Sequence, residues 1–420
     1  MTAWWRPEKG ASVAWLGLFL PGLLCYLHFL MLHLNQYPEV EGSEIHANVP
    51  TKLHEIIPPG AKVEIVADGF DFTEGTQWVD DEEAGRQYLL FSDVPKNRIW
   101  KWEEGGGLFT LGKSLFLDRS GCRGDHCSAL KLPGSNGLML APGSGEVVMC
   151  EHGDRRVTRM ENNGTKTPLA THFNGHRLNS PNDLAFSKRG DLYFTDPPYG
   201  LPLRQEDPEF QAHGFGGVYL VRKEAIEAAR AAPAGGEGAA PKAAAAAAAE
   251  PELVEKDFVW PNGLVFSPDS SKLYLAVSSP DEPAWYVYDV GEDGGLTNRR
   301  LFLDGRPLKE AHAVGAPDGM EVDERGNVFA TAPGGVVVLS PEGEHLGTVL
   351  AGGVFVANMV LANDGYLYIA ASTSIMRVRT QKNADRERER ERERARVLTK
   401  PARTANRTSR RRRRRHGSSV

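Results

Sequence analysis

Residues 260–277 read WPNGLVFSPDSSKLYLAV and contain the pattern that decides the fold. A polar residue, Asn262, opens a short apolar strand, a turn rich in Ser, Pro and Asp follows, and a second apolar strand begins at Lys272. A third strand, AWYVYDV, follows at residues 284–290. Short strands of β-branched and aromatic residues separated by such turns are typical of antiparallel β-sheet.

The same unit recurs six times. Its openings are EGTQWV at Glu74, SNGLMLAP at Asn136, SPNDLAFS at Asn182, WPNGLVFSP at Asn262, APDGMEVD at Asp318 and VANMVLAN at Asn358. Units of about 40–50 residues with four strands fit the blades of a propeller, and blades bury their faces only against their neighbours. The sequence therefore predicts an all-β fold, a six-bladed β-propeller over residues 60–378.

Two further points bear on this fold. The early strand KVEIVA, residues 62–67, is predicted to close the ring as the outer strand of the last blade. A two-sheet sandwich is the alternative architecture, but sandwiches rarely repeat a whole motif six times.

An apolar run from Ala11 to Leu34 precedes the repeats and is long enough to span a bilayer. Arg6 and Lys9 lie before it and acidic residues follow, which places the N-terminus in the cytosol and the body across the membrane. Residues 1–40 are therefore predicted to be a signal anchor, with a lumenal or extracellular body in the secretory pathway. A cleaved signal peptide and a secreted protein form the alternative.

The other segments outside the repeats are polar or of low complexity. Residues 35–60 are interpreted as a polar linker, residues 225–252 as an Ala-rich surface insertion, and residues 381–420 as a disordered basic tail. The tail carries a charge of +11, so a chain with a net charge of −6 has a body of −17. An acidic body argues against nucleic-acid binding and suits a domain that binds cations. Nuclear import or binding of a polyanion are alternative roles for the tail.

The chain has 4 cysteines and no CxxC pair, which argues against a structural zinc site. Cys122 and Cys127 flank the stretch RGDH. They form either a disulfide, if the domain is lumenal, or two free thiols on a loop.

In a propeller the innermost strands line the central channel, so the six openings converge on one end of it. The converging residues are Glu74, Asn136, Asn182, Asn262, Asp318 and Asn358. All present oxygen, the ligand that hard cations such as Ca²⁺ prefer, and the two carboxylates would neutralise one divalent ion. The alternative is that these residues merely cap turns. The absence of His and Cys from the ring argues against copper or haem.

Several longer motifs resemble one family. They are EGTQW, LLFSDVPKNRIWKW, CEHGDRRVTR, RLNSPNDLAF, YFTDPPYG, PNGLVFSPD, PDGMEVD and AASTSI, and together they span about 320 residues. They resemble the SMP-30/gluconolactonase (regucalcin-like) family of six-bladed propeller hydrolases, and its microbial gluconolactonases most of all. The stretch CRGDHCSALKL at residues 122–132 departs from the family pattern.

The resemblance implies one divalent metal held by Glu74, Asn262 and Asp318, with Asn182 as a further contact to metal or substrate. Asn136 and Asn358 match the repeat but have weaker support as metal ligands, and Asn136 is expected to contact the substrate. Ca²⁺ is the expected ion, with Zn²⁺, Mn²⁺ and Mg²⁺ as alternatives. The implied reaction is hydrolysis of a sugar lactone such as D-glucono-1,5-lactone. The metal would polarise the lactone carbonyl, and Asp318 is the expected base for water.

Other residues near the openings are candidates for contacts with the substrate. His152 either touches the substrate or bonds to the backbone as a loop histidine, and Arg156 is either a substrate contact or part of a salt bridge at a blade edge. Tyr199 either lines the mouth or packs a turn, and Asp196 is expected to orient that loop. No GxSxG, HExxH, GxGxxG or P-loop motif competes with a metal-assisted attack by water.

Three rival functions remain open. The first is a paraoxonase/arylesterase-like hydrolase of lipophilic lactones or esters. The second is a non-catalytic calcium-binding propeller that uses its face for a protein partner. The third, ranked low, is a strictosidine-synthase-like enzyme. The expected partners are a small lactone and, through the N-terminal segment, a membrane; the sequence gives no oligomeric state.

Overall fold

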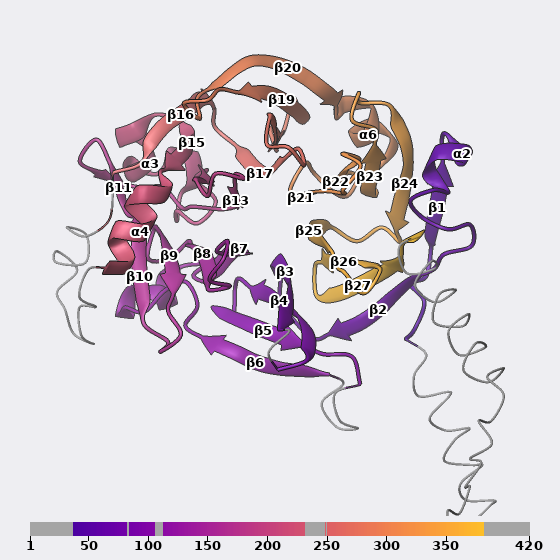
Figure 1. The fold of residues 1–420 in the computed structure, drawn as a ribbon, viewed down its shortest axis with the longest axis horizontal. Helices are drawn as coiled ribbons and strands as arrows, with labels where there is room; N and C mark the ends of the chain where they lie inside the picture. Colours follow the sequence, from indigo (N-terminus) through magenta and orange to yellow (C-terminus); the bar gives the residue numbers. More distant parts are fainter. Residues whose placement is uncertain (1–36, 82–83, 106–111, 232–247, 249, 382–420) are drawn as a thin grey trace, which may run out of the picture.

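The computed structural model describes residues 37–81, 84–105, 112–231, 248 and 250–381. In these residues six antiparallel sheets are arranged around one axis as the blades of a propeller (Figure 1). In each blade one strand lies innermost, and the other strands lie progressively farther from the axis. The innermost strands are β3 (Thr73–Asp81), β7 (Ser135–Leu140), β13 (Leu184–Phe186), β17 (Pro261–Phe266), β21 (Met320–Val322) and β25 (Val356–Leu361). The predicted six-bladed β-propeller is therefore confirmed.

The first four blades take their strands in sequence order. Blade 1 contains β3 (Thr73–Asp81), β4 (Arg86–Asp93), β5 (Arg98–Trp102) and β6 (Lys113–Asp118). Blade 2 contains β7 (Ser135–Leu140), β8 (Val147–Glu151), β9 (Arg156–Met160) and β10 (Lys166–Ala170). A small hairpin of β11 (His172–Phe173) and β12 (His176–Arg177) follows. Blade 3 contains β13 (Leu184–Phe186), β14 (Leu192–Asp196), β15 (Gly216–Val221) and β16 (Glu252–Phe258). Blade 4 contains β17 (Pro261–Phe266), β18 (Lys272–Val277), β19 (Ala284–Val290) and β20 (Leu296–Asp304).

The last two blades each take one strand from the N-terminal part of the chain. Blade 5 contains β21 (Met320–Val322), β22 (Val328–Ala332), β23 (Gly335–Leu339) and β24 (His345–Ala351), with β1 (Ser43–Ala47) added at its outer edge. Blade 6 contains β25 (Val356–Leu361), β26 (Tyr366–Ala371) and β27 (Ser374–Arg379), and β2 (Val63–Asp68) completes it.

Strand β2 closes the ring, as the sequence predicted. It runs antiparallel to β27, with Val63 opposite Val378 and Glu64 opposite Arg377. The Arg377 guanidinium donates a hydrogen bond to the Glu64 carboxylate at 2.9 Å across this pair. Because β2 covers the outer edge of β27, the last blade presents no unpaired β27 backbone to solvent.

The interpretation of residues 35–60 as a polar linker is wrong. Strand β1 pairs with β24 along its whole length, and the short helix α2 (Pro50–Leu53) follows it. Ile45 packs against the cluster between blades 5 and 6, and Leu53 and Ile57 are fully buried there. The apolar residues of this segment are few, but their spacing lets one face pack on the propeller.

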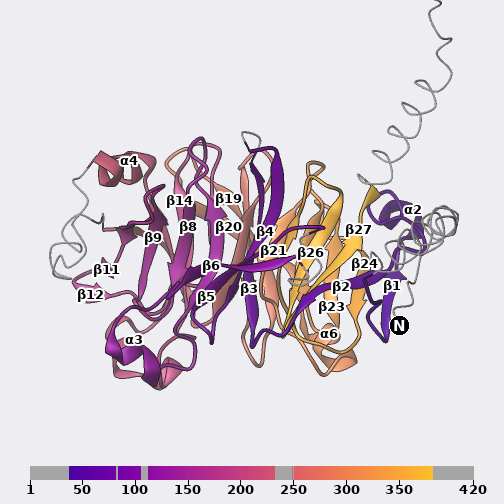
Figure 2. The same cartoon turned by 90° about the horizontal axis from the view of Figure 1, so that it is seen from below.

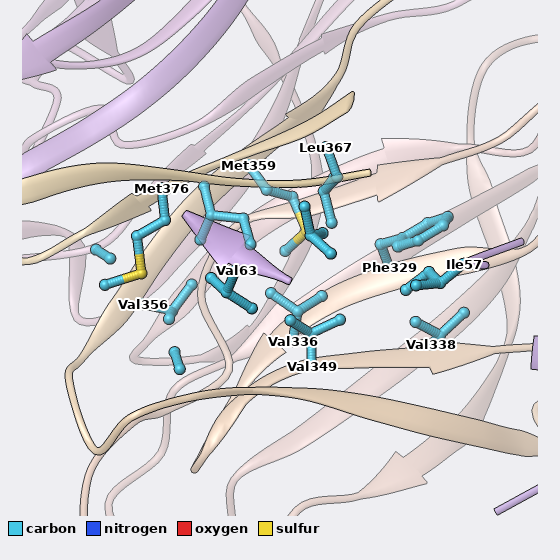
Figure 3. Close-up of a cluster of buried hydrophobic side chains, with 14 of the residues drawn as sticks. Ile57, Val63, Phe329, Val336, Val338, Val349, Val356, Met359, Leu367 and Met376 are labelled. Carbon is cyan, nitrogen blue, oxygen red and sulfur yellow. The ribbon is translucent and has the colours of Figure 1, made fainter. Parts of the chain in front are cut away.

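The core between blades 5 and 6 shows how neighbouring blades hold each other. Val336 and Val349 from blade 5 face Met359 and Leu367 from blade 6, and Val63 of β2 lies among them (Figure 3). All five side chains are almost completely buried. Each sheet thus covers the apolar face of the next, which is how a ring of thin blades forms one core.

Short helices lie on both faces of the propeller. Figure 2 shows α3 (Pro208–His213) and α6 (Arg306–Ala311) on one face and α4 (Lys223–Ala231) on the other. Helix α3 begins at Asp207, whose carboxylate accepts a hydrogen bond from the Glu209 amide at 3.0 Å, and ends at Gly214 with a φ of 78°. Two 3₁₀-helices, η1 (Asp125–Ala129) and η2 (Arg204–Glu206), complete the elements. We refer to the side that carries α3 and α6 as the α3/α6 face.

The predicted insertion at residues 225–252 is not a loop at its beginning. Helix α4 continues through it to Ala231 and packs against β10. Ile226 and Ala229, three residues apart on one side of the helix, are buried in the core of blades 2 and 3. Residues 232–247 and 249 lie outside the described residues.

None of the helices in the described part of the chain combines the length and apolar character that a membrane span needs. The predicted anchor, Ala11–Leu34, and nearly all of the predicted basic tail lie outside that part. What the sequence predicts about the location of the protein and about its tail stays a prediction.

Candidate active site

The openings of the inner strands meet at the α3/α6 face and touch one another around the channel. A Cβ added to Gly75 would lie 1.9 Å from the carbonyl oxygen of Asn136, and one added to Gly263 would lie 2.1 Å from that of Asp318. A Cβ added to Gly137 would lie 2.8 Å from the Asn182 carbonyl oxygen of the blade 3 opening, and one added to Gly319 would lie 2.8 Å from the Asn358 Cα of the blade 6 opening. At these four openings a glycine after the polar residue is therefore required for the close approach to the next opening.

Hydrogen bonds between openings fix this ring. The Gly137 amide donates to the Asn182 carbonyl oxygen at 2.7 Å, and the Gly319 amide donates to the Ala357 carbonyl oxygen at 2.7 Å. The Thr76 hydroxyl donates to the Asn358 amide oxygen at 3.0 Å and so links blade 1 to blade 6.

Irregular pairing directs the polar side chains. The register of the innermost strand pair shifts at four openings: between Glu74 and Gln77, Ser135 and Leu138, Pro261 and Leu264, and Val356 and Asn358. Such shifts are β-bulges, which re-aim side chains at functional sites. The bulges interrupt the regular alternation of side chains between the two faces of the sheet, so that the opening residues point toward the ring.

Three carboxyl groups, of Glu74, Asp183 and Asp318, lie at the openings, and those of Glu74 and Asp318 are buried. Burial and the neighbouring Asp183 carboxylate raise the pKa of Glu74 to about 8. Burial, with the charges of Glu74 and Asp183, raises the pKa of Asp318 well above its usual range. Burial also raises the pKa of Asp183 to about 7. Carboxylates that repel each other away from water stay ionised together only when a cation compensates them.

Two amide groups supply unused oxygens at the same place. The side-chain oxygens of Asn182 and Asn262 are buried and have no hydrogen-bond donor in the described part of the protein. The Nδ2 of Asn262 donates to the Ser278 hydroxyl at 2.9 Å, which leaves the oxygen on the other side of the amide. A buried carbonyl oxygen without a donor is costly, and a hard cation satisfies it. Glu74, Asn182, Asn262 and Asp318 therefore fit a divalent metal.

Asn136 and Asn358 belong to the ring in a different way. Both hydrogen-bond the Glu74 carboxylate through their side chains. The Asn358 oxygen is already used, because it accepts from the Thr76 hydroxyl and from the Met359 amide. These two amides orient Glu74, which agrees with their weaker support as ligands in the sequence.

Tyr199 lines the site. Its hydroxyl accepts a hydrogen bond from Asn262 Nδ2 at 3.4 Å, and burial raises its pKa. Its ring stacks on Trp260 with centroids 5.2 Å apart and an interplanar angle of 28°. The loop that carries Tyr199 is held by Ser180, whose hydroxyl donates to the Pro197 carbonyl oxygen at 2.6 Å and accepts from the Gly200 amide at 2.9 Å.

His152 lies under the same loop. A Cβ added to Gly200 would lie 2.9 Å from the Cβ of His152, and the His152 side chain is almost completely buried. Neither of its ring nitrogens has a hydrogen-bond partner among the described residues. Burial lowers the pKa of His152 to about 4, so the imidazole is neutral near pH 7. The backbone-bonded loop histidine that the sequence allowed is thus not what the structure shows.

Behind His152 lies the segment that departs from the family pattern. Cys122 and Cys127 form a disulfide, the first of the two predicted alternatives. A Cβ added to Gly153 would lie 2.4 Å from the Cβ of Cys122, so this loop packs directly beside His152. Cys122, His126 and Cys127 are the one group of three metal-ligand types whose atoms cluster within 4.8 Å in the described residues. Their two sulfurs are bonded to each other, so this group is not a metal site in this state.

Arg156 forms the salt bridge that was the alternative to a substrate contact. Its guanidinium donates to the fully buried Glu151 carboxylate and, at 3.0 Å, to Asp154. Lys166 also binds Glu151, with its Nζ 2.6 Å from the carboxylate. This pairing lowers the pKa of Glu151 against the effect of burial. Arg156 thus organises blade 2, and its contact with a substrate stays a prediction.

Asp196 orients its loop, as predicted. Its carboxylate accepts a hydrogen bond from the Asn179 amide at 2.7 Å, and its backbone oxygen accepts from Asn179 Nδ2 at 2.9 Å. Burial raises the pKa of Asp196 to about 7.

Residues 72–373 match the model of the SMP-30/Gluconolactonase/LRE-like region. The chain belongs to this family. The propeller residues from β3 to β26 fall within the match, and so does every residue of the ring. The resemblance found in the sequence motifs is therefore confirmed.

Known members support the same assignment. This SMP-30/gluconolactonase chain is 32% identical to the gluconolactonase of Zymomonas mobilis over 335 residues, which are 79% of this chain and 84% of that protein. Its fold is similar to that of a gluconolactonase from Xanthomonas campestris, with a TM-score of 0.62 and 23% identity over 82% of this chain and 97% of that one. It is also similar to the structure of a putative gluconolactonase, with a TM-score of 0.59 and 29% identity over 80% and 98% of the two chains.

Sequence reasoning missed three residues of this SMP-30/gluconolactonase site. Asp183 takes the place of the glycine that follows the polar residue at four other openings, a signal that a comparison of the repeats would have found. Ser278 and Trp260 carried no comparable signal. Ser278 meets Asn262 only because β17 and β18 pair within blade 4, and Trp260 meets Tyr199 only because blades 3 and 4 lie side by side.

Proposed function

We propose that the protein is a metal-dependent lactonase that opens a sugar lactone, such as D-glucono-1,5-lactone, by attack of water. The main support is the pair of buried amide oxygens without donors, Asn182 and Asn262, beside two buried carboxyl groups, Glu74 and Asp318. The resemblance to gluconolactonases supplies the reaction class.

Glu74, Asn182, Asn262 and Asp318 are the proposed metal ligands. Ca²⁺ is the expected ion because all four ligands are oxygens, and Mg²⁺, Mn²⁺ and Zn²⁺ are alternatives. The bound ion would polarise the lactone carbonyl and stabilise the charge on its oxygen. Asn136 and Asn358 hold the Glu74 carboxylate, and Ser278 holds the Asn262 amide.

Asp318 is the proposed base that accepts the proton of the attacking water. Its burial makes it a stronger base than an exposed aspartate. The neighbouring Glu74 and Asp183 carboxyls oppose its ionisation, so Asp318 is charged at neutral pH only while a cation compensates the group. Removal of the metal would therefore remove the base as well.

His152 and Tyr199 are the proposed contacts to the substrate. The neutral imidazole of His152 has one donor and one acceptor without partners, which suits a lactone hydroxyl. The Tyr199 hydroxyl lies beside Asn262 and is protonated, so it is placed to donate to an oxygen of the substrate.

A lactone panel tests the proposal. The purified protein is treated with a chelator, each of the four metals is added back, and turnover is measured on D-glucono-1,5-lactone, phenyl acetate and an acyl-homoserine lactone. We expect turnover only with metal and highest on the sugar lactone. An intact fold and bound metal without turnover on any lactone would support a non-catalytic propeller instead.

Two variants separate the proposed roles. Asp318→Asn should lose most turnover while it keeps the fold and much of the metal affinity, and undiminished turnover would exclude Asp318 as the base. Glu74→Gln should raise the metal concentration needed for half-maximal activity. An unchanged metal titration would exclude Glu74 as a ligand.

We also propose a lumenal or extracellular body held by the N-terminal segment, with a secreted form as the alternative. The Cys122–Cys127 disulfide supports an oxidising compartment. Asn163 of the sequon NGT lies exposed in a turn, where it is accessible for glycosylation. A loss of apparent mass after endoglycosidase treatment is expected in wild type but not in Asn163→Gln. An unglycosylated protein with free thiols at 122 and 127 would contradict this location.

A further inference from the structure

The exposed apolar side chains of the propeller are unevenly distributed. Among the described residues, the large hydrophobic side chains that are clearly exposed are Leu115, Leu203, Val259, Leu301 and Val314. Leu115 and Leu301 lie on outer strands, β6 and β20. The other three lie in loops of the α3/α6 face, close in sequence to residues of the site.

Each of the three loops leads directly to the site. Leu203 is four residues after Tyr199, Val259 is three residues before Asn262, and Val314 is four residues before Asp318. Leu203 is 60% exposed, although its neighbour Leu201 is buried. Leu203 therefore contributes little to the packing of the propeller, whereas Leu201 belongs to the buried core.

Contacts tie these loops into one surface. Tyr199 stacks on Trp260, and its hydroxyl accepts from Asn262 Nδ2. The Ser278 amide donates to the Trp260 carbonyl oxygen at 3.0 Å, and the Ser278 hydroxyl donates to the Pro317 carbonyl oxygen. The loops of blades 3, 4 and 5 are thus joined around the proposed metal ligands of blades 4 and 5. We call Tyr199, Leu203, Val259, Trp260 and Val314 the apolar rim.

The side of the site formed by blade 2 is different in character. His152 is almost completely buried under the Tyr199–Gly200 loop, and the charged groups Arg156, Glu151 and Asp154 lie behind it. The exposed apolar side chains of the mouth therefore belong to the loops of blades 3 to 5. A substrate that carries hydroxyl groups on every carbon would not cover the apolar rim, whose side chains would stay exposed to water.

We infer that the apolar rim binds an alkyl or aryl substituent of the lactone, so that lactones with an apolar substituent are substrates in addition to the sugar lactone. This inference rests on the proposed lactonase function and extends its substrate class. The lactone ring lies at the ring of openings, and its apolar arm lies over the stacked Tyr199 and Trp260 toward Leu203 and Val314.

A series of δ-lactones that differ only in the alkyl group tests the inference. δ-Valerolactone, δ-hexalactone, δ-octalactone and δ-decalactone carry no, one, three and five side-chain carbons. Burial of each methylene should raise kcat/KM by up to about fourfold, mainly through KM, until the rim is covered. The metal concentration is held at saturation for every substrate.

Variants identify the surface responsible. Leu203→Ala and Trp260→Ala should both flatten the rise of kcat/KM with chain length. Leu301→Ala is the matched control, because it removes an equally exposed leucine from the outer strand β20. It should leave the rise unchanged. If Trp260→Ala does not fold, the rise of kcat/KM with chain length in Leu203→Ala, compared with that in Leu301→Ala, is sufficient to test the apolar rim.

The outcomes separate this inference from the function it rests on. Turnover of D-glucono-1,5-lactone and δ-valerolactone without any rise along the series would overturn the apolar rim and leave the lactonase standing. An equal effect of Leu203→Ala and Leu301→Ala would also overturn it. No turnover on any lactone with metal present would overturn both proposals.

Discussion

Lowering the pH from 7 to 4 should destabilise the folded protein through His152, because this imidazole takes up a proton more readily in the unfolded state. The ring lies beneath the Tyr199–Gly200 loop, and both of its nitrogens lack partners among the described residues. The nearby Glu151 carboxylate does not help, because Lys166 and Arg156 already pair with it. A charged imidazole is therefore poorly accommodated in the folded state, and the unfolded state binds the proton more strongly.

The size of the effect follows from the pKa values. Burial lowers the pKa of His152 from 6.5 to about 4. The depressed pKa of His152 stabilises the folded state fully at a pH above the pKa of His152 in the unfolded chain. This stabilisation is lost as the pH falls from about 6.5 to about 4. A change of this size corresponds to ~3 kcal/mol in the free energy of unfolding.

Urea unfolding at pH 7, 5.5 and 4 measures this contribution. His152→Leu has no proton to gain, so its free energy of unfolding should fall between pH 7 and 4 by about 3 kcal/mol less than that of wild type. Other groups, such as Asp196, titrate in both proteins and cancel in the comparison. His176→Leu removes an exposed histidine and is the control. An identical pH dependence in wild type and His152→Leu would refute the claim that His152 is buried without partners.

Three further perturbations test the ring and the blades. Gly263→Ala places a Cβ 2.1 Å from a backbone oxygen of the blade 5 opening, so turnover and stability should both fall, whereas Gly295→Ala meets only a side chain at 3.3 Å and should be tolerated. Lys166→Met leaves the buried Glu151 carboxylate with one cation fewer and should cost roughly 3 kcal/mol in urea unfolding, much of which Glu151→Gln in the same chain should restore. Deletion of residues 62–67 removes β2 from the outer edge of β27 and should lower the melting temperature, and an unchanged melting temperature would speak against ring closure by β2.

The repeat made the propeller predictable from sequence. Six openings that each begin with an acid or amide residue, followed in four cases by glycine, determine both the number of blades and the end of the channel where they meet. The closing strand was predictable for the same reason, because the last unit lacked an outer strand and KVEIVA supplied one. Strand β1 was not, since a fifth strand on blade 5 repeats nothing elsewhere in the chain.

The chemistry of the ring was only partly predictable. From the repeat alone, all six opening residues were equally good candidates for metal ligands. The resemblance to the family singled out Glu74, Asn262 and Asp318, with Asn182 beside them. The structure supplies a physical reason for that ranking, because the oxygens of Asn182 and Asn262 are free while that of Asn358 accepts two hydrogen bonds. Tyr199 and Trp260 meet across a blade boundary, and a pattern within one repeat carries no information about such a contact.

Binding of Ca²⁺ to the chelated protein, followed by calorimetry, tests the central claim most directly. Wild type should bind one ion in the ring, and Glu74→Gln should bind it at least about tenfold more weakly, a loss of ~1.4 kcal/mol or more. Asp118→Asn removes an exposed carboxylate of strand β6 and should bind as wild type does. Equal affinities in wild type and Glu74→Gln would contradict the proposal that the strand openings hold a metal.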